Sequence, residues 1–296
     1  ALRVSLGEKL GVEAEQIFVG NGGDDVLSVL ARTFLNEGEE AIIPQPTFSP
    51  YAHVTRVMGG VVVPSPLRAF RVDLEDVLSK VGSRTKLIFL CSPNNPTGTI
   101  IPERELTQFL ERLPETVLVL LDEAYGDFAD DPGWPDSMAL IGRFPLIVLR
   151  SFSKIYGLAG LRVGYGIGDS GLIGFMHRVR EPFNVNQLAQ VAAMAALEDE
   201  EFRERSIRQV GEERRRYYEA LGRIGMEYVE SQANFIFVRV GDGDGATEVL
   251  MKNGLIVRPG SPFGCPEWIR VTMGLPEENT RLIRMLEKIA PPSGSG

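Results

Sequence analysis

The chain has 296 residues, of which 44% are hydrophobic and 24% are charged, and its formal net charge is −9. This size predicts one large domain or two linked domains, and the negative charge argues against nucleic acid or an anionic membrane as the main partner. Two cysteines and two histidines are too few for a disulfide framework or a histidine-based metal cluster. No apolar run has the length of a membrane span, so we expect a cytoplasmic protein.

Short apolar runs alternate with helical patterns over the first two thirds of the chain. The runs are nearly continuous in apolar residues, which is typical of strands buried on both faces. The predicted strands cover 16–19, 40–44, 60–64, 86–91, 116–121, 145–149 and 162–167. The predicted helices between them include 24–35, 48–58, 73–80 and 102–112. This alternation predicts an α/β fold with a mostly parallel seven-stranded sheet flanked by helices.

The pattern changes near residue 187. A long helical region at 187–223 precedes several short apolar runs and a last helix near 277–289, which predicts a smaller α+β domain. We therefore predict a large domain at 1–187, a small C-terminal domain at 188–290, and a disordered tail or cloning remnant at 291–296. The first residues already show helical spacing without a cap or an initiator methionine, so the chain is expected to begin inside a longer fold.

Polar and glycine-rich segments follow five of the predicted strands. In a parallel sheet the carboxyl ends of the strands meet at one edge, and ligands bind there. The segments are GNGGDD (20–25), PQPTFSPY (44–51), CSPNNPTG (91–98), DEAY (122–125) and RSFSK (150–154). The sequence therefore predicts a binding site at this edge.

GNGGDD opens a helix with small residues. Exposed backbone N–H groups and the helix dipole make such a turn an anion site. The alternative is ordinary helix capping, with Asp24 or Asp25 as the N-cap. The segment is not a Walker loop, because no Gly-Lys-Ser/Thr follows it.

Asp122 and Asn95 each have a structural and a chemical interpretation. Asp122 ends an apolar strand, where a buried carboxylate needs a cationic partner. It could pair with a protonated ring nitrogen, as a pyridoxal cofactor requires, or only cap the next helix. Asn95 could donate its amide to a phenolic oxygen or simply form a turn with the following proline. The loop aspartates at 127, 130 and 131 are expected to be solvated.

Lys154 lies at a strand end, whereas the other lysines have patterns typical of the surface. An amine nucleophile must lose its proton, which burial and nearby cations favour. Ser151, Ser153 and Arg162 could bind a phosphate beside it. A lysine in a loop is usually solvated. The polar segments at the other four strand ends favour the interpretation of Lys154 as a nucleophile.

The ordered motifs resemble the fold-type-I pyridoxal-phosphate aminotransferases, and most of all the histidinol-phosphate aminotransferases. The motifs are GNGGDD, PTFSPY, SPNNPTG, DEAY, RSFSK and GLAGLRVGY, followed by PFNVN, SQANFIFV, LIVRP and IRVTMG. Each is weak alone, but the ordered set is specific and covers nearly the whole chain. The resemblance implies fold type I, pyridoxal 5'-phosphate as cofactor, and a homodimer with its sites at a two-fold interface.

The resemblance also implies roles for residues around the cofactor ring. Lys154 binds the cofactor covalently and then moves a proton between the substrate and the cofactor. Asp122 pairs with the pyridine nitrogen, and Phe48 stacks on the ring. Asn95 and Tyr125 donate hydrogen bonds to the phenolic oxygen.

Two further groups of residues follow from the resemblance. The implied phosphate site contains Gly23, Asp24, Ser151, Ser153 and Arg162. The implied substrate residues are Asn234, Arg258 and Arg270. Arg270 binds the α-carboxylate through two hydrogen bonds. Arg258 reaches a substrate phosphate or braces the site.

The implied reaction transfers the amino group of histidinol phosphate to 2-oxoglutarate, giving imidazole acetol phosphate and glutamate. The alternatives are an aromatic amino acid aminotransferase, an enzyme like threonine-phosphate decarboxylase, and a cofactor-binding module without turnover. A nucleotide-binding enzyme would leave SPNNPTG and RSFSK unexplained. Members of the family carry an N-terminal arm that helps close the site and reaches the partner subunit, and this sequence begins after the position of that arm.

Overall fold

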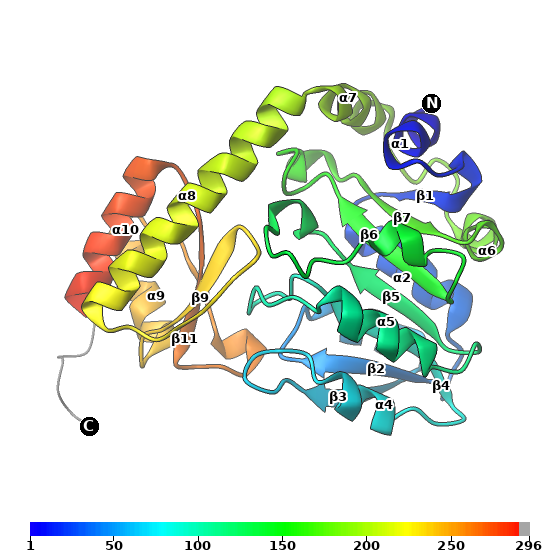
Figure 1. Cartoon of the computed structure of the whole chain (residues 1–296), viewed down its shortest axis with the longest axis horizontal. Helices are drawn as coiled ribbons and strands as arrows, with labels where there is room; N and C mark the ends of the chain where they lie inside the picture. Colours follow the sequence, from blue (N-terminus) through cyan, green and yellow to red (C-terminus); the bar gives the residue numbers. More distant parts are fainter. Residues whose placement is uncertain (290–296) are drawn as a thin grey trace.

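The computed structural model describes residues 1–289, and a seven-stranded sheet organises their first part (Figure 1). Its strands are β1 (Ile17–Gly20), β2 (Glu40–Gln45), β3 (Val61–Pro66), β4 (Thr85–Cys91), β5 (Leu118–Asp122), β6 (Leu146–Ser151) and β7 (Gly164–Gly168). Each predicted strand is confirmed within two residues of its bounds. The predicted mostly parallel α/β sheet is confirmed as well.

The strand order explains why five strand ends meet. The order is β1-β7-β6-β5-β4-β2-β3, and every pair from β6 to β3 is parallel. β7 is antiparallel to both β6 and β1. Since β7 reverses the direction, β1 runs the same way as β6, and the segment after β1 lies at the same edge as those after β4, β5 and β6.

Helices cover both faces of this sheet. Alternate residues of β4 and β5 pack into different cores, which is why the strands are apolar throughout. One face carries α2 (Gly23–Phe34), α3 (Pro50–Val57) and α6 (Ser170–Val179). The other carries α1 (Leu2–Leu10), α4 (Leu74–Ser79), α5 (Glu103–Glu111) and α7 (Gln187–Glu198).

A second, antiparallel sheet has four strands in the order β10-β11-β9-β8. They are β8 (Tyr228–Val229), β9 (Phe235–Arg239), β10 (Arg258–Pro259) and β11 (Trp268–Thr272). A third core joins this sheet to α8 (Glu200–Ile224), α9 (Gly243–Lys252) and α10 (Pro276–Ile289). Figure 1 shows α8 running from α7 to the four-stranded sheet, so this helix links the two sheets.

The helical region predicted at 187–223 consists of two helices rather than one. The break lies at Asp199, whose backbone leaves the helical conformation and whose carboxylate accepts a hydrogen bond of 3.0 Å from the N–H of Phe202. Asp199 thus caps α8 as an aspartate at an N-cap commonly does.

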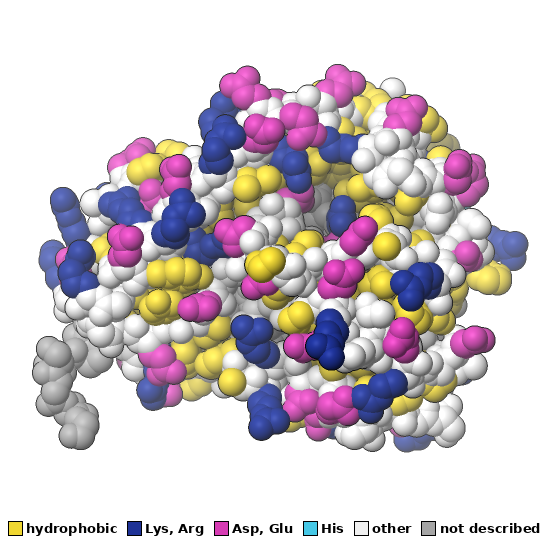
Figure 2. All heavy atoms as spheres, in the orientation of Figure 1, with side chains coloured by type: hydrophobic (Ala, Val, Ile, Leu, Met, Phe, Trp, Pro, Cys, Tyr) yellow, Lys and Arg dark blue, Asp and Glu magenta, His cyan; other side chains and the backbone are white. Residues whose placement is uncertain are grey.

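Much of the charged surface of α8 is exposed, although Glu213 and Arg214 are buried. Arg205 and Arg208 pair with glutamates one turn earlier in the helix. Figure 2 shows acidic and basic side chains interspersed over the face of the molecule in view. Within residues 1–289, no helix combines the length and apolar character needed to cross a membrane. The tail predicted at 291–296 lies outside the described residues.

Candidate active site

The strand ends enclose a cavity of about 170 Å³. Predicted residues that line it are Gly23, Asp24, Phe48, Asp122, Ser151, Ser153, Lys154 and Arg162. Tyr125 lies beside them, with its ring centre 4.9 Å from Nζ of Lys154. Residues from four of the five predicted strand-end segments, together with Arg162, therefore line one small cavity, whereas no residue of 91–98 is part of its lining.

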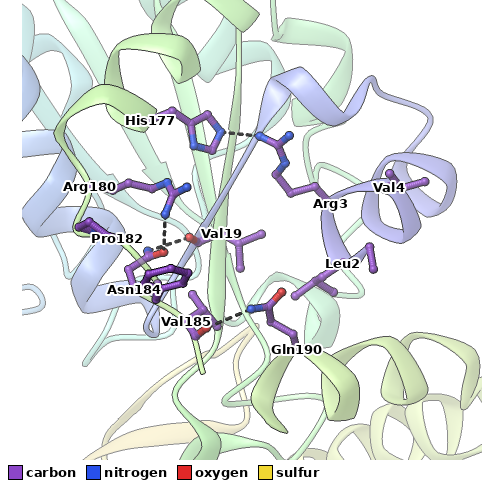
Figure 3. Close-up of a pocket in the computed structure, with 12 residues that line it drawn as sticks. Leu2, Arg3, Val4, Val19, His177, Arg180, Pro182, Asn184, Val185 and Gln190 are labelled. Carbon is purple, nitrogen blue, oxygen red and sulfur yellow. Dashed lines mark hydrogen bonds between the residues drawn. The ribbon is translucent and has the colours of Figure 1, made fainter. Parts of the chain in front are cut away.

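A larger cavity, of about 600 Å³, lies elsewhere, between the start of α1 and the segment that follows α6. Figure 3 shows Arg3 and His177 facing each other across it, with 2.8 Å between Nη1 of Arg3 and Nε2 of His177. Its lining contains none of the predicted site residues. We place the active site in the smaller cavity because the chemically distinctive side chains gather there.

Asp122 is buried at the end of β5, and each of its carboxylate oxygens accepts a hydrogen bond. Oδ2 accepts from the hydroxyl of Tyr51 at 2.6 Å, and Oδ1 accepts from the N–H of Ala124 at 2.9 Å. Burial raises the pKa of Asp122, and the two hydrogen bonds and the charge of Lys154 oppose this rise. A cation placed against this carboxylate would offset the cost of burying it.

Tyr51 was assigned no role from the sequence, although it ends the motif PTFSPY. It is fully buried in α3, where its ring stacks on Phe89 and meets the edge of Phe48. A buried tyrosine hydroxyl usually has a hydrogen-bond partner, and Asp122 is that partner. Tyr51 thus connects the predicted stacking residue to the predicted counter-ion.

Lys154 is half buried directly after β6. The chain turns sharply behind it, because Gly157 donates its N–H to the carbonyl of Lys154 and Leu158 donates to the carbonyl of Phe152. This turn holds the lysine side chain above the ring of Tyr125.

The amino end of α2 and Arg162 line one side of the cavity. Arg162 has a left-handed backbone with φ of 56° and donates from Nη2 to Oδ2 of Asp24 at 3.2 Å. A Cβ at Gly22 would lie 2.5 Å from Nη2 of Arg162, so only glycine allows this approach. The first N–H groups of a helix and a guanidinium together suit a phosphate.

Neither Asp24 nor Asp25 is the N-cap of α2, contrary to the capping alternative. The N-cap is Gly22, with φ of 82°. Asp24 pairs with Arg162 instead. Asp25 accepts hydrogen bonds from the N–H of Asn21 and the amide of Asn184. The two aspartates are therefore occupied by long-range contacts, which the local pattern did not reveal.

Ser151 and Ser153 lie on the same side as Arg162. Oγ of Ser151 accepts a hydrogen bond of 3.0 Å from the N–H of Ser153, so its own hydroxyl proton stays available to a ligand. Both side chains line the cavity.

Asn95, in the loop after β4, and Arg270, on β11 of the other sheet, are joined by a hydrogen bond. Nη1 of Arg270 donates to Oδ1 of Asn95 at 2.5 Å, which leaves the amide of Asn95 free to donate. Nε of Arg270 is buried and has no partner among residues 1–289. Burial lowers the pKa of Arg270, Arg258 also lowers it, and Tyr125 opposes them. A bound carboxylate would satisfy this N–H group.

Arg258 and Asn234 are less tightly integrated. Arg258 is exposed on β10 and lies directly opposite Arg270 in the register of β10 and β11. Asn234 is half buried, and its carbonyl accepts a hydrogen bond from Met273. Arg258 therefore lies beside Arg270 on the neighbouring strand, and Asn234 is held in place by a hydrogen bond to its backbone carbonyl.

The residues present fit pyridoxal phosphate. The partly compensated carboxylate of Asp122 suits a ring nitrogen, the free amide of Asn95 suits a phenolic oxygen, and the glycine-lined end of α2 with Arg162 suits a phosphate. Lys154 supplies the amine for the aldehyde.

Comparisons with known proteins agree with this chemistry. The family model "Aminotransferase class I and II" matches residues 1–286. A histidinol-phosphate aminotransferase of Moorella thermoacetica is 47% identical over 97% of this chain and 75% of its own length. Histidinol-phosphate aminotransferase 2 of Carboxydothermus hydrogenoformans is 43% identical over 97% of this chain and 80% of its own.

Solved structures show the same similarity. The histidinol-phosphate aminotransferase of Sinorhizobium meliloti, in complex with pyridoxal-5'-phosphate, matches with a TM-score of 0.90 and 28% identity, covering 97% of this chain and 80% of that one. A putative histidinol-phosphate aminotransferase of Erwinia carotovora matches with a TM-score of 0.92 and 26% identity, covering 97% and 84%. The chain therefore belongs to the aminotransferase class I and II family, and it is a pyridoxal-phosphate-dependent transferase of the histidinol-phosphate aminotransferase group.

Proposed function

We propose that the enzyme transfers the amino group of histidinol phosphate to 2-oxoglutarate, forming imidazole acetol phosphate and glutamate. The observation that carries the proposal is that Lys154 and Asp122 line one cavity, while Arg270 lies against Phe235, whose ring packs edge-on with that of Tyr125 beside Lys154. Together these residues provide an amine, a buried carboxylate and a cation suited to a carboxylate. The names of its relatives support the choice of amino donor.

The residue roles form part of the same proposal. When bound, pyridoxal phosphate supplies the carbonyl and the electron-withdrawing ring for amino-group transfer. Lys154 holds the cofactor through Nζ and then carries a proton at that atom. Asp122 keeps the ring nitrogen protonated, and Phe48 covers the ring. Asn95 and Tyr125 donate to the phenolic oxygen.

Two other groups bind the anionic parts of the ligands. The backbone N–H groups of Gly23 and Asp24, with Ser151, Ser153 and Arg162, would hold the phosphate of the cofactor. Arg270 binds the α-carboxylate of glutamate or 2-oxoglutarate, and Asn234 lies near the substrate. Arg258 is exposed beside Arg270, and we propose that it reaches the phosphate of histidinol phosphate.

The proposal also covers the organisation of the protein. We infer a cofactor-binding domain at 1–187, a small domain at 188–290, a homodimer and a cytoplasmic location. The exposed apolar side chains of Phe183, which is 96% exposed, and Leu188, which is 78% exposed, support a second copy of this chain as the partner. Sedimentation equilibrium tests the dimer, and a monomer at micromolar concentration would contradict it.

A substrate panel tests the reaction. The loaded enzyme should form glutamate from 2-oxoglutarate with histidinol phosphate as donor, and Arg258→Ala should raise KM for histidinol phosphate without raising KM for glutamate. Turnover with phenylalanine alone would favour an aromatic aminotransferase. Release of carbon dioxide from threonine phosphate would favour a decarboxylase. Loss of every half-reaction would favour a module without turnover.

Borohydride reduction tests the role of Lys154 separately from the substrate. Reduction of the loaded protein followed by peptide mapping should place the cofactor on Lys154 and on no other lysine. If Lys154→Ala still shows the absorbance of lysine-bound cofactor, the assignment is wrong.

A further inference from the structure

The turn at 68–71, between β3 and α4, has a strained backbone. Ala69 has φ of 49° and Phe70 has φ of 62°, so two consecutive residues other than glycine are left-handed. Arg68 and Arg71 exchange two backbone hydrogen bonds, of 2.9 and 3.0 Å. Such two-residue turns usually contain Asn-Gly, because a larger side chain in the left-handed conformation is sterically strained. Strain of this kind persists where surrounding contacts hold it, and it concentrates at functional sites.

Phe70 makes the contacts that accompany this strain. Its ring meets the ring of Trp268 edge-on with 4.7 Å between centroids, and that of Phe237 with 5.9 Å. Trp268 and Phe237 stack on each other at 5.0 Å. Phe70 follows β3 of the seven-stranded sheet, whereas Trp268 and Phe237 belong to β11 and β9 of the four-stranded sheet. The strained turn therefore joins the two sheets.

The face that Phe70 contacts is the one that carries Arg270. Phe237 lies directly opposite Arg270 in the register of β9 and β11, and Trp268 precedes Arg270 by two residues on its strand. Residues opposite each other, and residues two apart, share a face of a sheet. The guanidinium of Arg270 lies 4.9 Å from the ring centre of Phe235, which is on this face as well.

The same turn also supports the loop that carries Asn95. The carbonyl of Phe70 accepts a hydrogen bond of 2.8 Å from Oγ1 of Thr99. On the other side of this loop, the carbonyl of Gly98 accepts from the N–H of Gln232 at 2.8 Å. A Cβ at Gly98 would lie 2.1 Å from Oγ of Ser231, so the loop and the second sheet are in close contact. Phe70 thus contacts both structures that meet in the hydrogen bond between Asn95 and Arg270.

We propose that Phe70 is a positioning residue for substrate binding, which sets the place of Arg270 relative to Asn95 and Lys154 by fixing the four-stranded sheet against the loop at 91–99. This inference rests on the proposed role of Arg270 in binding the substrate carboxylate. No residue of the 68–71 turn lines the cavity that holds Lys154 and Asp122, so we expect Phe70 to affect substrate affinity more than cofactor affinity.

Two glycine substitutions distinguish the effect of the Phe70 ring from the effect of the strained backbone. Phe70→Gly removes the ring and relaxes the backbone, whereas Ala69→Gly relaxes the neighbouring position and keeps the ring. For the loaded enzyme, Phe70→Gly should raise KM for 2-oxoglutarate and glutamate by about tenfold, since small displacements of a binding group are costly. Ala69→Gly should leave both KM values unchanged. Neither variant should change the Kd of pyridoxal phosphate for the cofactor-free protein by more than about twofold.

Tryptophan fluorescence gives a readout that does not depend on turnover. The chain has two tryptophans, so Trp134→Phe leaves Trp268, which touches Phe70, as the reporter. Acrylamide should quench Trp268 more strongly in Phe70→Gly than in Ala69→Gly. Phe70→Tyr, which keeps an aromatic ring at this position, should show the same KM and the same weak quenching as the wild-type enzyme. If Phe70→Gly fails to fold, Phe70→Leu replaces it with the same expectations.

A double variant distinguishes failure of this inference from failure of the proposed function. If Phe70 acts through Arg270, then Phe70→Gly combined with Arg270→Lys should be no worse than Arg270→Lys alone. An unchanged KM in Phe70→Gly, or an equal loss of cofactor and substrate affinity, overturns the inference while leaving the site intact. An unchanged KM in Arg270→Lys overturns the proposed role of Arg270 and the inference with it.

Discussion

The two sides of the candidate site are built in different ways. On the cofactor side, Asp122 and Ser151 end neighbouring strands of one sheet, and Lys154 follows the second strand. The side chain of Asp122 is held by Tyr51 of α3 and by the N–H of Ala124, and that of Ser151 by the N–H of Ser153. On the substrate side, Arg270 comes from the other sheet, is tied to Asn95 by one hydrogen bond, and keeps a buried N–H group without a partner in residues 1–289.

This difference indicates which part of the site is preformed. Hydrogen bonding between neighbouring strands fixes the relative positions of the cofactor-side residues. These residues are therefore in place once the seven-stranded sheet has folded. The substrate side depends on how two sheets pack, and contacts such as that of Phe70 with Trp268 decide its geometry. Substitutions should therefore affect either cofactor affinity or substrate affinity, according to the side that they disturb.

The largest effect is expected at Asp122, which serves the cofactor and through it the chemistry. Asp122→Ala should lower kcat by about 10³-fold or more, because the ring nitrogen loses the charge that keeps it protonated. Single-turnover absorbance measurements with glutamate give the rate. Asp122→Asn, which keeps the size and removes the charge, should lose nearly as much. If Asp122→Asn retains the wild-type rate, the counter-ion role is wrong.

Arg270→Lys should disturb the substrate side alone. A lysine cannot form the paired hydrogen bonds of a guanidinium, so the Kd for 2-oxoglutarate should rise by about 100-fold while the Kd for pyridoxal phosphate stays the same. Fluorescence titration measures both constants. The matched control is Arg239→Lys, at an exposed arginine on neighbouring β9, which should change neither. A parallel loss of both affinities would show that the two sides are not separable.

Gly22→Ala should lower the affinity for the cofactor, because it disturbs the cofactor side of the site. Its Cβ would press on Nη2 of Arg162, and its φ of 82° disfavours a side chain, so cofactor affinity should fall by about tenfold. Equilibrium dialysis with pyridoxal phosphate measures the change. Gly38→Ala is the control, because Gly38 has φ of 78° and no heavy atom near its Cβ position. Equal losses in the two variants would assign the effect to backbone strain alone.

The last effect concerns stability rather than ligand affinity: Tyr51→Phe should destabilise the cofactor-free protein by an amount that depends on pH. Burial raises the pKa of Asp122 above its unfolded value, so the stability that this group contributes in the cofactor-free protein is lost as pH rises through the folded pKa. The Tyr51 hydroxyl opposes that rise. Without it, the free energy of unfolding should be lower by about 1.5–3 kcal/mol at neutral pH and by less in acid.

Urea denaturation of the cofactor-free protein over a pH series measures this difference. Tyr228→Phe, at a half-buried tyrosine on β8, should follow the wild-type curve. Parallel curves for wild type and Tyr51→Phe would mean that the hydroxyl does not act on the ionisation of Asp122.

Much of the cofactor side could be predicted from the sequence. The segments DEAY and RSFSK directly follow runs that are apolar on both faces, so their place at strand ends follows from hydrophobic burial alone. The contact of Tyr51 with Asp122 could not be predicted in this way, since their separation of 71 positions leaves no local pattern to detect. The suggestion that Asp24 or Asp25 caps α2 was wrong for the same reason. Asp24 instead pairs with Arg162, which is 138 positions away in the sequence.

By itself the sequence determined where the strands lie, which polar segment follows each strand, and which residue types are available for chemistry. These features depend on apolar periodicity and turn residues, which act over a few positions. Only the tertiary structure decided that Arg270 meets Asn95, 175 positions away, and that Phe70 lies in a strained turn against Trp268. These contacts depend on how two separately formed sheets pack. Their geometry arises from the sum of many side-chain shapes rather than from any local pattern.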